Sequence, residues 1–216
     1  MRFNSAREAE DYIKRTIGIP YVVFDGFSIC ILNAVVSSLE EMTSKYSVLK
    51  NAISSIGAEY FISKQIESLN SNLSLSEFEY VNDFSAVKVE MQNGYYLAII
   101  LASILKHFSI KSKSIETRGH TTAKSIKWGI YHECAHILDF MLCISKAPEF
   151  IELIKNKNLE LLISKCASTS PLEAFAEAFA KYHIDGISND LVEQIMKLFD
   201  RVYNSSLNIK KIERVI

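Results

Sequence analysis

Tyr131-His132-Glu133-Cys134-Ala135-His136-Ile137-Leu138-Asp139 is an apolar, helix-compatible stretch that contains the pattern His-Glu-x-x-His. On an α-helix of about 3.6 residues per turn, His132 and His136 lie one turn apart on the same face. Two imidazoles placed in this way can share one Zn²⁺, and Glu133 then points toward a metal-bound water as general base. The alternative is that both histidines are satisfied core residues. The stretch predicts a zinc site that needs a further ligand from another segment.

A second helix, predicted for residues 171–183, supplies candidate carboxylates. Ser170 is its N-cap and Pro171 its first-turn proline, while Glu173 and Glu177 lie one turn apart on the same face. Their neighbours are Ala and Phe, so the helix is largely buried, and buried carboxylates need a partner that a cation can provide. The alternatives are that Glu173 closes a capping box with Ser170 and that Glu177 is a surface glutamate.

Composition excludes several classes of partner. The chain has 216 residues and a net charge of −1, which gives no electrostatic footprint for nucleic acid or an anionic membrane. The longest apolar run, residues 95–105, is too short to span a bilayer, and the N-terminus has no secretory apolar region. The cysteines have no paired spacing, which is typical of free thiols in a reducing compartment. We expect a protein that is cytoplasmic at synthesis; its oligomeric state stays open.

The predicted elements alternate between helices and a few short strands. Helices are expected at residues 6–16, 28–46, 58–69, about 121–144, 149–154, 159–165, 171–183 and 190–203. Strands are expected at residues 20–24, 52–56, 86–91 and 95–101. The last two strands flank Asn93-Gly94, a strong hairpin signal, and this hairpin is a candidate edge for binding an extended substrate. A purely structural sheet is the alternative.

These elements predict an α+β fold in a single domain, residues 1–216. A small, twisted, mixed sheet is expected to pack on the helix that carries His132 and His136. The sheet and this helix form a lobe of about residues 1–145, and a helical lobe of about residues 146–216 supplies Glu173.

The two motifs carry a family resemblance. His132-Glu133-x-x-His136-x-x-Asp139, followed by Glu173-Ala-Phe-Ala-Glu177-Ala-Phe, resembles the gluzincin zinc metallopeptidases. Within that group the chain is similar to the anthrax lethal factor catalytic domain, the clostridial Pro-Pro endopeptidases and zincin-like domains of phages and prophages. Residues 4–12 also resemble the start of the phage-type domains, more loosely. The resemblance implies a zincin-like fold, a bacterial or phage context, and a peptide or protein substrate whose identity the sequence does not give.

The resemblance also implies a role for each matching residue. His132, His136 and Glu173 would bind one Zn²⁺, and Glu133 would activate the attacking water. Glu177 would accept a hydrogen bond from the free ring nitrogen of a ligand histidine, and Asp139 would orient a ligand in a similar way. The expected activity is that of a zinc-dependent endopeptidase.

One position departs from the family pattern. Relatives commonly have a tyrosine seven residues before the glutamate ligand, where its hydroxyl stabilises the oxyanion, and this chain has Cys166 there. A neutral thiol is a weak donor, and loss of an oxyanion donor costs about 10²–10³ in rate. Three side chains are candidate substitutes: Tyr131, Tyr182 and His183. Cys166 could instead bind the metal as a thiolate.

Two other functions compete with peptide hydrolysis. The domain could bind zinc with little or no catalysis and serve a phage-related structural or interaction role, which Cys166 favours and Glu133 disfavours. Ser168-Thr169-Ser170 also resembles a motif of ADP-ribosyltransferases. Those enzymes have Glu-x-Glu downstream, whereas this chain has Glu173-x-x-x-Glu177, and that function leaves the His-Glu pattern unexplained.

Overall fold

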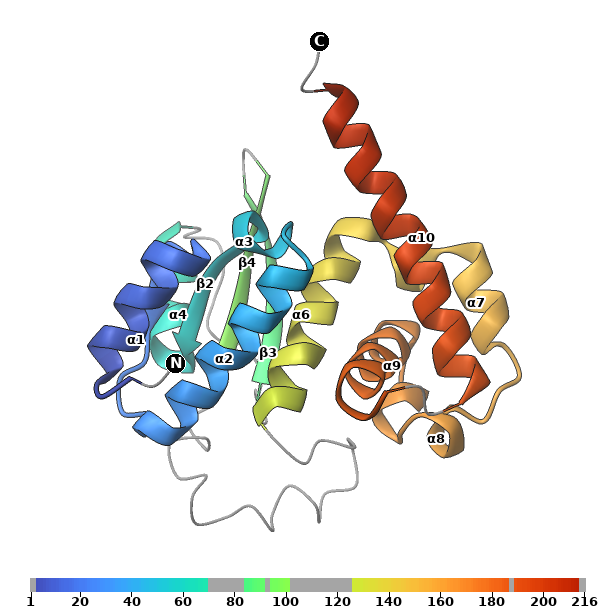
Figure 1. Ribbon diagram of the computed structural model, residues 1–216, viewed down its shortest axis with the longest axis horizontal. Helices are drawn as coiled ribbons and strands as arrows, with labels where there is room; N and C mark the ends of the chain where they lie inside the picture. The colour runs from blue at the N-terminus through green and yellow to red at the C-terminus, as the bar shows by residue number, and fades with distance from the viewer. Residues whose placement is uncertain (1–2, 70–83, 92–93, 102–125, 187–188, 214–216) are drawn as a thin grey trace.

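The computed structural model describes residues 3–69, 84–91, 94–101, 126–186 and 189–213. Most of these residues are helical, and a four-stranded sheet has the order β1-β2-β4-β3 (Figure 1). Strands β1 (Tyr21–Val23) and β4 (Gly94–Leu101) pair in parallel with β2 (Ile53–Ala58), and β3 (Phe84–Met91) pairs antiparallel with β4. The α+β class and the small mixed sheet are confirmed.

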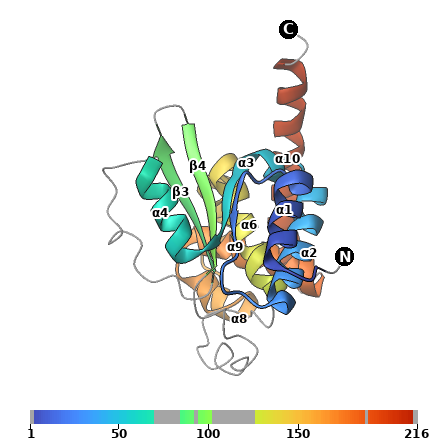
Figure 2. The ribbon, with the colours of Figure 1, turned by 90° about the vertical axis from the view of Figure 1, so that its left-hand side faces the viewer.

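The first helices begin where the sequence supplies a cap. In α1 (Ala6–Tyr12), the Ser5 hydroxyl accepts from a first-turn backbone N–H. The helix continues as a π-helical segment, η1 (Ile13–Ile17), and ends at Gly18, which adopts the left-handed conformation. Ser28 caps α2 (Ile29–Lys45). Figure 2 shows α1 and α2 on one side of the sheet and α4 (Glu59–Leu69) on the other.

Strand β2 extends further than the sequence predicted. Gly57 was expected to end the strand, yet β2 continues through it to Ala58, and a short helix, α3 (Leu49–Ala52), precedes the strand. The reason is the close approach of β1, because a Cβ atom on Gly57 would lie 2.2 Å from the Val23 carbonyl oxygen. Glycine at this point therefore permits pairing rather than ending the strand.

Helix α6 (Ile126–Leu142) carries the His-Glu-x-x-His motif and lies between the sheet and the C-terminal helices (Figure 1). It packs against β3, α2 and α9, and every residue from Trp128 to Asp139 is buried. In the sequence, Thr121 or Thr122 is a candidate cap for this helix, and both lie outside the described residues. The helix ends at Leu142 because Cys143 adopts a left-handed conformation with φ of 56°.

The C-terminal third is helical. Its elements in chain order are η4 (Ile144–Lys146), α7 (Pro148–Ile154), α8 (Leu159–Leu162), η5 (Cys166–Ser168), α9 (Pro171–Asp185) and α10 (Asp190–Glu213). Helix α8 is shorter than predicted and α10 is longer; the end of α10 projects beyond the other helices (Figure 1). Edge-to-face contacts join the α10 residue Phe199 to Phe179 of α9 and Tyr46 after α2.

The buried apolar residues form one continuous core that runs from the N-terminal helices to α10. The His-Glu helix lies within this core, so its position is fixed by packing on several sides. Among the described helices, none is both long enough and apolar enough to cross a membrane.

Gly57→Ala should reduce the free energy of unfolding by about 3 kcal/mol, because the added methyl group overlaps the backbone of β1. Gly18→Ala is the matched control. Its φ is +88°, but the nearest atom to an added Cβ is 3.7 Å away, so only the conformational cost of about 1 kcal/mol applies. Chemical denaturation of both variants measures the difference. Equal losses would show that the approach of β1 to Gly57 is not limiting.

Candidate metal centre

Three side chains from two helices converge on one point. His132 and His136 come from α6, and Glu173 comes from the first turn of α9. The two Nε2 atoms lie 2.9 Å apart, and the Glu173 carboxylate lies 3.2 Å from His132 Nε2 and 3.3 Å from His136 Nε2. One nitrogen or oxygen atom of each residue lies within 4.8 Å of the corresponding atoms of the other two. Such a buried His-His-Glu group could hold a metal ion.

The start of α9 directs Glu173 toward the histidines. Ser170 is the N-cap, and its hydroxyl accepts from the Glu173 backbone N–H at 3.1 Å, so the cap uses the backbone of Glu173 and not its carboxylate. The Glu173 carboxylate instead contacts the two histidines and Cys166. Its side chain is 26% exposed, so this ligand position retains access to solvent.

Glu177 lies one turn further along α9 and is completely buried. Its Oε1 is 2.9 Å from His132 Nδ1, and neither carboxylate oxygen has another hydrogen-bond partner among the described residues. Glu177 is therefore not a surface glutamate. With Nδ1 of His132 directed at Glu177, the Nε2 lone pair is left for a cation.

Glu133 occupies the position expected for a general base. Its side chain is buried between α6 and β3, and one oxygen accepts a hydrogen bond from the backbone N–H of Ala86. The other oxygen, Oε2, has no partner among the described residues. Burial raises the pKa of Glu133, although the two histidines and the Ala86 amide oppose this shift.

The charges of this cluster favour a cation. Burial alone would lower the pKa of His132, but Glu173, Glu177 and the charge of Glu133 together raise it well above its usual range. Burial likewise opposes ionisation of Glu173, yet His132 and His136 lower the pKa of that carboxyl group. Three carboxylates therefore surround two imidazoles, and a divalent cation would neutralise this excess of negative charge.

The donor set fits zinc. Two imidazole nitrogens and one carboxylate form the three-protein-ligand set of a catalytic zinc site, which keeps a fourth position for water or substrate. Imidazole also binds other transition metals, so the donors alone do not identify the ion.

The structure gives Asp139 a different role from the predicted one. Its Oδ1 accepts from the backbone N–H of Ser145, and its Oδ2 accepts from the Ser145 hydroxyl, both at 2.6 Å. These bonds hold the turn after α6 and leave Asp139 out of the metal centre. The second candidate ligand, His136, instead stacks on Phe140 with ring centroids 6.4 Å apart. Its Nδ1 has no hydrogen-bond partner among the described residues.

The expected substitutes for the missing tyrosine belong to a separate polar cluster. His183 Nε2 lies 2.9 Å from the Tyr46 hydroxyl, and Nδ1 lies 3.2 Å from Lys45 Nζ. Because an ammonium group can only donate, Nδ1 accepts and the Nε2–H donates to Tyr46. Tyr131 and Tyr182 pack edge-on against His183. In the described part of the chain, none of the three substitutes contacts the candidate ligands.

Cys166 lies beside the metal centre. Its Sγ donates to Glu173 Oε2 at 3.2 Å, and Sγ is not one of the atoms that converge in the described His-His-Glu group. Burial and the neighbouring charge of Glu173 raise the pKa of this thiol, which therefore stays protonated. In the metal-free protein, Cys166 is therefore a hydrogen-bond donor to Glu173 and not a thiolate.

Two residues that contact the candidate site were not predicted from the sequence. Phe140 follows His136 by one helical turn, so the spacing alone could have indicated the stacking contact. The Ala86 amide could not be found in this way, because it depends on the docking of β3 against α6.

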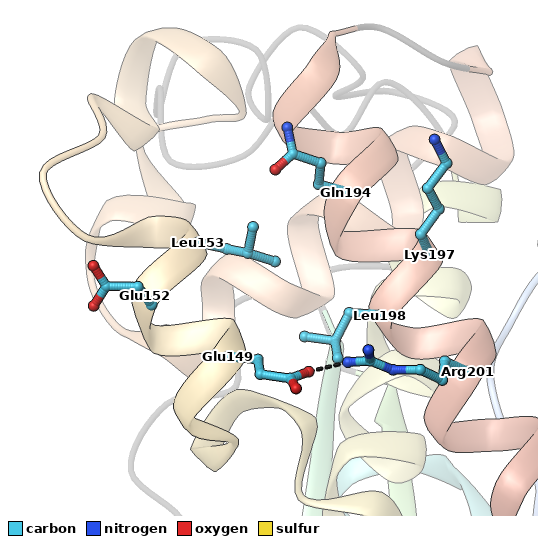
Figure 3. Close-up of a pocket in the computed structure, with 7 residues that line it drawn as sticks. All are labelled: Glu149, Glu152, Leu153, Gln194, Lys197, Leu198 and Arg201. Atoms are coloured by element: carbon cyan, nitrogen blue, oxygen red, sulfur yellow. Dashed lines mark hydrogen bonds and ion pairs between the residues drawn. The ribbon is translucent and has the colours of Figure 1, made fainter.

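A hollow of about 640 Å³ lies between α7 and α10 (Figure 3). Leu153 and Leu198 line it, and an ion pair between Glu149 and Arg201 joins the two helices beside it. Lys197, which also lines it, pairs with Glu193 on its own helix. No candidate metal ligand lines this hollow, so it is separate from the His-His-Glu group.

The chemistry of the site is inferred from its own geometry. The chain matches no protein-family model and no curated protein. The described residues nevertheless bring His132, His136 and Glu173 together, and the nearby carboxylate of Glu133 is buried and hydrogen-bonded to strand β3.

Glu177→Gln should weaken zinc binding by about 10–100-fold, because the neutral amide no longer supports the imidazole of His132 as a carboxylate does. Competition with a chromophoric chelator measures this affinity. Glu160→Gln, an exposed position on α8, is the control and should leave zinc binding unchanged. Unaltered affinity in the Glu177 variant would exclude the supporting role.

His183 should make the protein less stable in acid. Burial, followed by the charge of Lys45, lowers the pKa of His183 from 6.5 to about 4. The unfolded chain thus binds the proton more readily, so this stability is complete above pH 6.5 and is lost as the pH falls toward about 4. His183→Gln should remove on the order of 2 kcal/mol of the difference in unfolding free energy between pH 7 and pH 4. Identical pH profiles for the two proteins would contradict the assignment.

Proposed function

We propose that this chain is a zinc-dependent endopeptidase of the gluzincin type. The observation that carries the proposal is the convergence of His132, His136 and Glu173, with the buried carboxylate of Glu133 beside them. Glu133 follows the first histidine directly, as the general base does in the His-Glu-x-x-His pattern of zinc metalloproteases. The resemblance of both helices to the gluzincins supports the same assignment.

Zinc held by these three side chains would supply a Lewis acid and would make water acidic enough to deprotonate near neutral pH. Glu133 would take the proton of the attacking water and pass it to the leaving amine. Burial suits Glu133 to this exchange because it brings the pKa of the carboxyl group closer to neutrality. Glu177 would hold the His132 tautomer throughout.

Strand β3 is the proposed substrate edge. It is the terminal strand of the described sheet and packs against α6. The Ala86 N–H points at Glu133 rather than at β4, so one edge of the β3 backbone faces the candidate base. An extended peptide that adds to this edge as a further strand would place a carbonyl group near the metal centre. This arrangement favours an endopeptidase over a hydrolase of small molecules.

The direct test is metal analysis of the purified protein combined with a peptide-library cleavage assay. Wild-type protein should contain about one zinc per chain and cleave peptides. Glu133→Gln should keep the metal and lose at least about a hundredfold in cleavage rate. Glu152→Gln, an exposed glutamate of α7, is the control. Absence of zinc from the wild-type protein would refute the proposal. Undiminished cleavage by the Glu133 variant would show that Glu133 is not the general base.

The second candidate is a zinc-binding domain with little or no peptidase activity and a phage-related structural or interaction role. Cys166 favours it, because the thiol donates to Glu173 and none of the candidate substitutes among the described residues contacts the site. Zinc in the wild-type protein without cleavage, and no gain from Cys166→Tyr, would support this candidate over the endopeptidase.

A further inference from the structure

Cys166 is held in a rigid turn immediately before α9. The Cys166 carbonyl oxygen accepts from the Thr169 N–H at 3.0 Å and from the Thr169 hydroxyl at 2.7 Å. The next residue, Ala167, donates its backbone N–H to the Ser164 hydroxyl at 3.1 Å. These bonds hold the peptide unit between Cys166 and Ala167, which restricts the position of the cysteine Cβ atom before any ligand binds.

The thiol reaches one oxygen of one candidate ligand. Cys166 Sγ lies 3.2 Å from Glu173 Oε2, which is also the oxygen closest to His132. The other oxygen, Oε1, lies toward His136. Unlike the two imidazole rings, which are buried in the core, the Glu173 side chain is partly exposed, so neighbouring atoms restrict its rotation on fewer sides. A hydrogen bond to one of its oxygens restricts that rotation.

We infer that Cys166 is a positioning residue that orients the Glu173 carboxylate toward the metal, rather than a fourth ligand or a donor to the oxyanion. Its single S–H is engaged by Glu173, which leaves no proton to donate to a substrate. The inference rests on the proposed metal site and adds a role for the position at which the gluzincin pattern has tyrosine. In this chain that position supports a ligand.

Zinc affinity measured with a chromophoric chelator tests this inference without reference to peptide cleavage. Cys166→Ala should weaken zinc binding by about tenfold, since loss of an outer-shell partner costs about 10–100-fold. Cys166→Ser keeps a hydroxyl donor of similar size and should bind zinc within about threefold of wild type. Cys30→Ala, an exposed cysteine of α2, controls for thiol chemistry. Denaturation of each metal-free variant shows whether it is folded.

The absorption spectrum of the Co²⁺-loaded wild-type protein separates positioning from ligation. A positioning thiol predicts no thiolate-to-cobalt charge-transfer band, and the appearance of that band would overturn the inference while leaving the metal site intact. Equal zinc affinity in wild type and Cys166→Ala would overturn it as well. Failure of the wild type to bind zinc would instead remove the proposed function itself, so the two failures are distinguishable.

Discussion

The contact between the buried carboxylate of Glu177 and Nδ1 of His132 sets the relation of the two helices that build the candidate metal centre. A carboxylate without exposed surface is strongly disfavoured unless a hydrogen-bonding or charged partner meets it. Helix α9 must therefore pack on α6 in a register that pairs these two groups. Because Glu173 precedes Glu177 by one turn, the same register brings Glu173 to the Nε2 atoms of both histidines. A shift of one residue would lose all of these contacts.

The chain contains two histidine clusters with opposite electrostatic character, both at the contact of α6 with α9. Carboxylates surround His132 and raise its pKa, whereas burial and lysines lower the pKa of His183. The first cluster attracts positive charge, and the second keeps a neutral ring as a hydrogen-bonded joint between α2 and α9. The same residue type thus forms a candidate ligand group in one place and a packing contact in the other, and the surrounding charges decide which.

Local spacing made much of the fold and the candidate site predictable. The members of each pair, His132 with His136 and Glu173 with Glu177, are one helical turn apart. Ser170 marks the start of α9. These features are visible in the sequence. The hydrogen-bond partner of Asp139 was not predicted, because Ser145 reaches it only through the left-handed turn after α6. Features that depend on contacts between distant segments, such as the strand through Gly57, cannot be found from spacing.

The origin of the ligands in two separate helices has a thermodynamic consequence. A cation bound by His132, His136 and Glu173 would cross-link α6 to α9, and the unfolded chain offers no comparable site. By mass action, free metal at about a hundred times its dissociation constant would add about 2.7 kcal/mol to the stability of the folded state. The ion would therefore stabilise the fold by cross-linking two helices, in addition to its role in catalysis. Removal of the metal would weaken the contact between α6 and α9 and would also abolish the proposed hydrolysis.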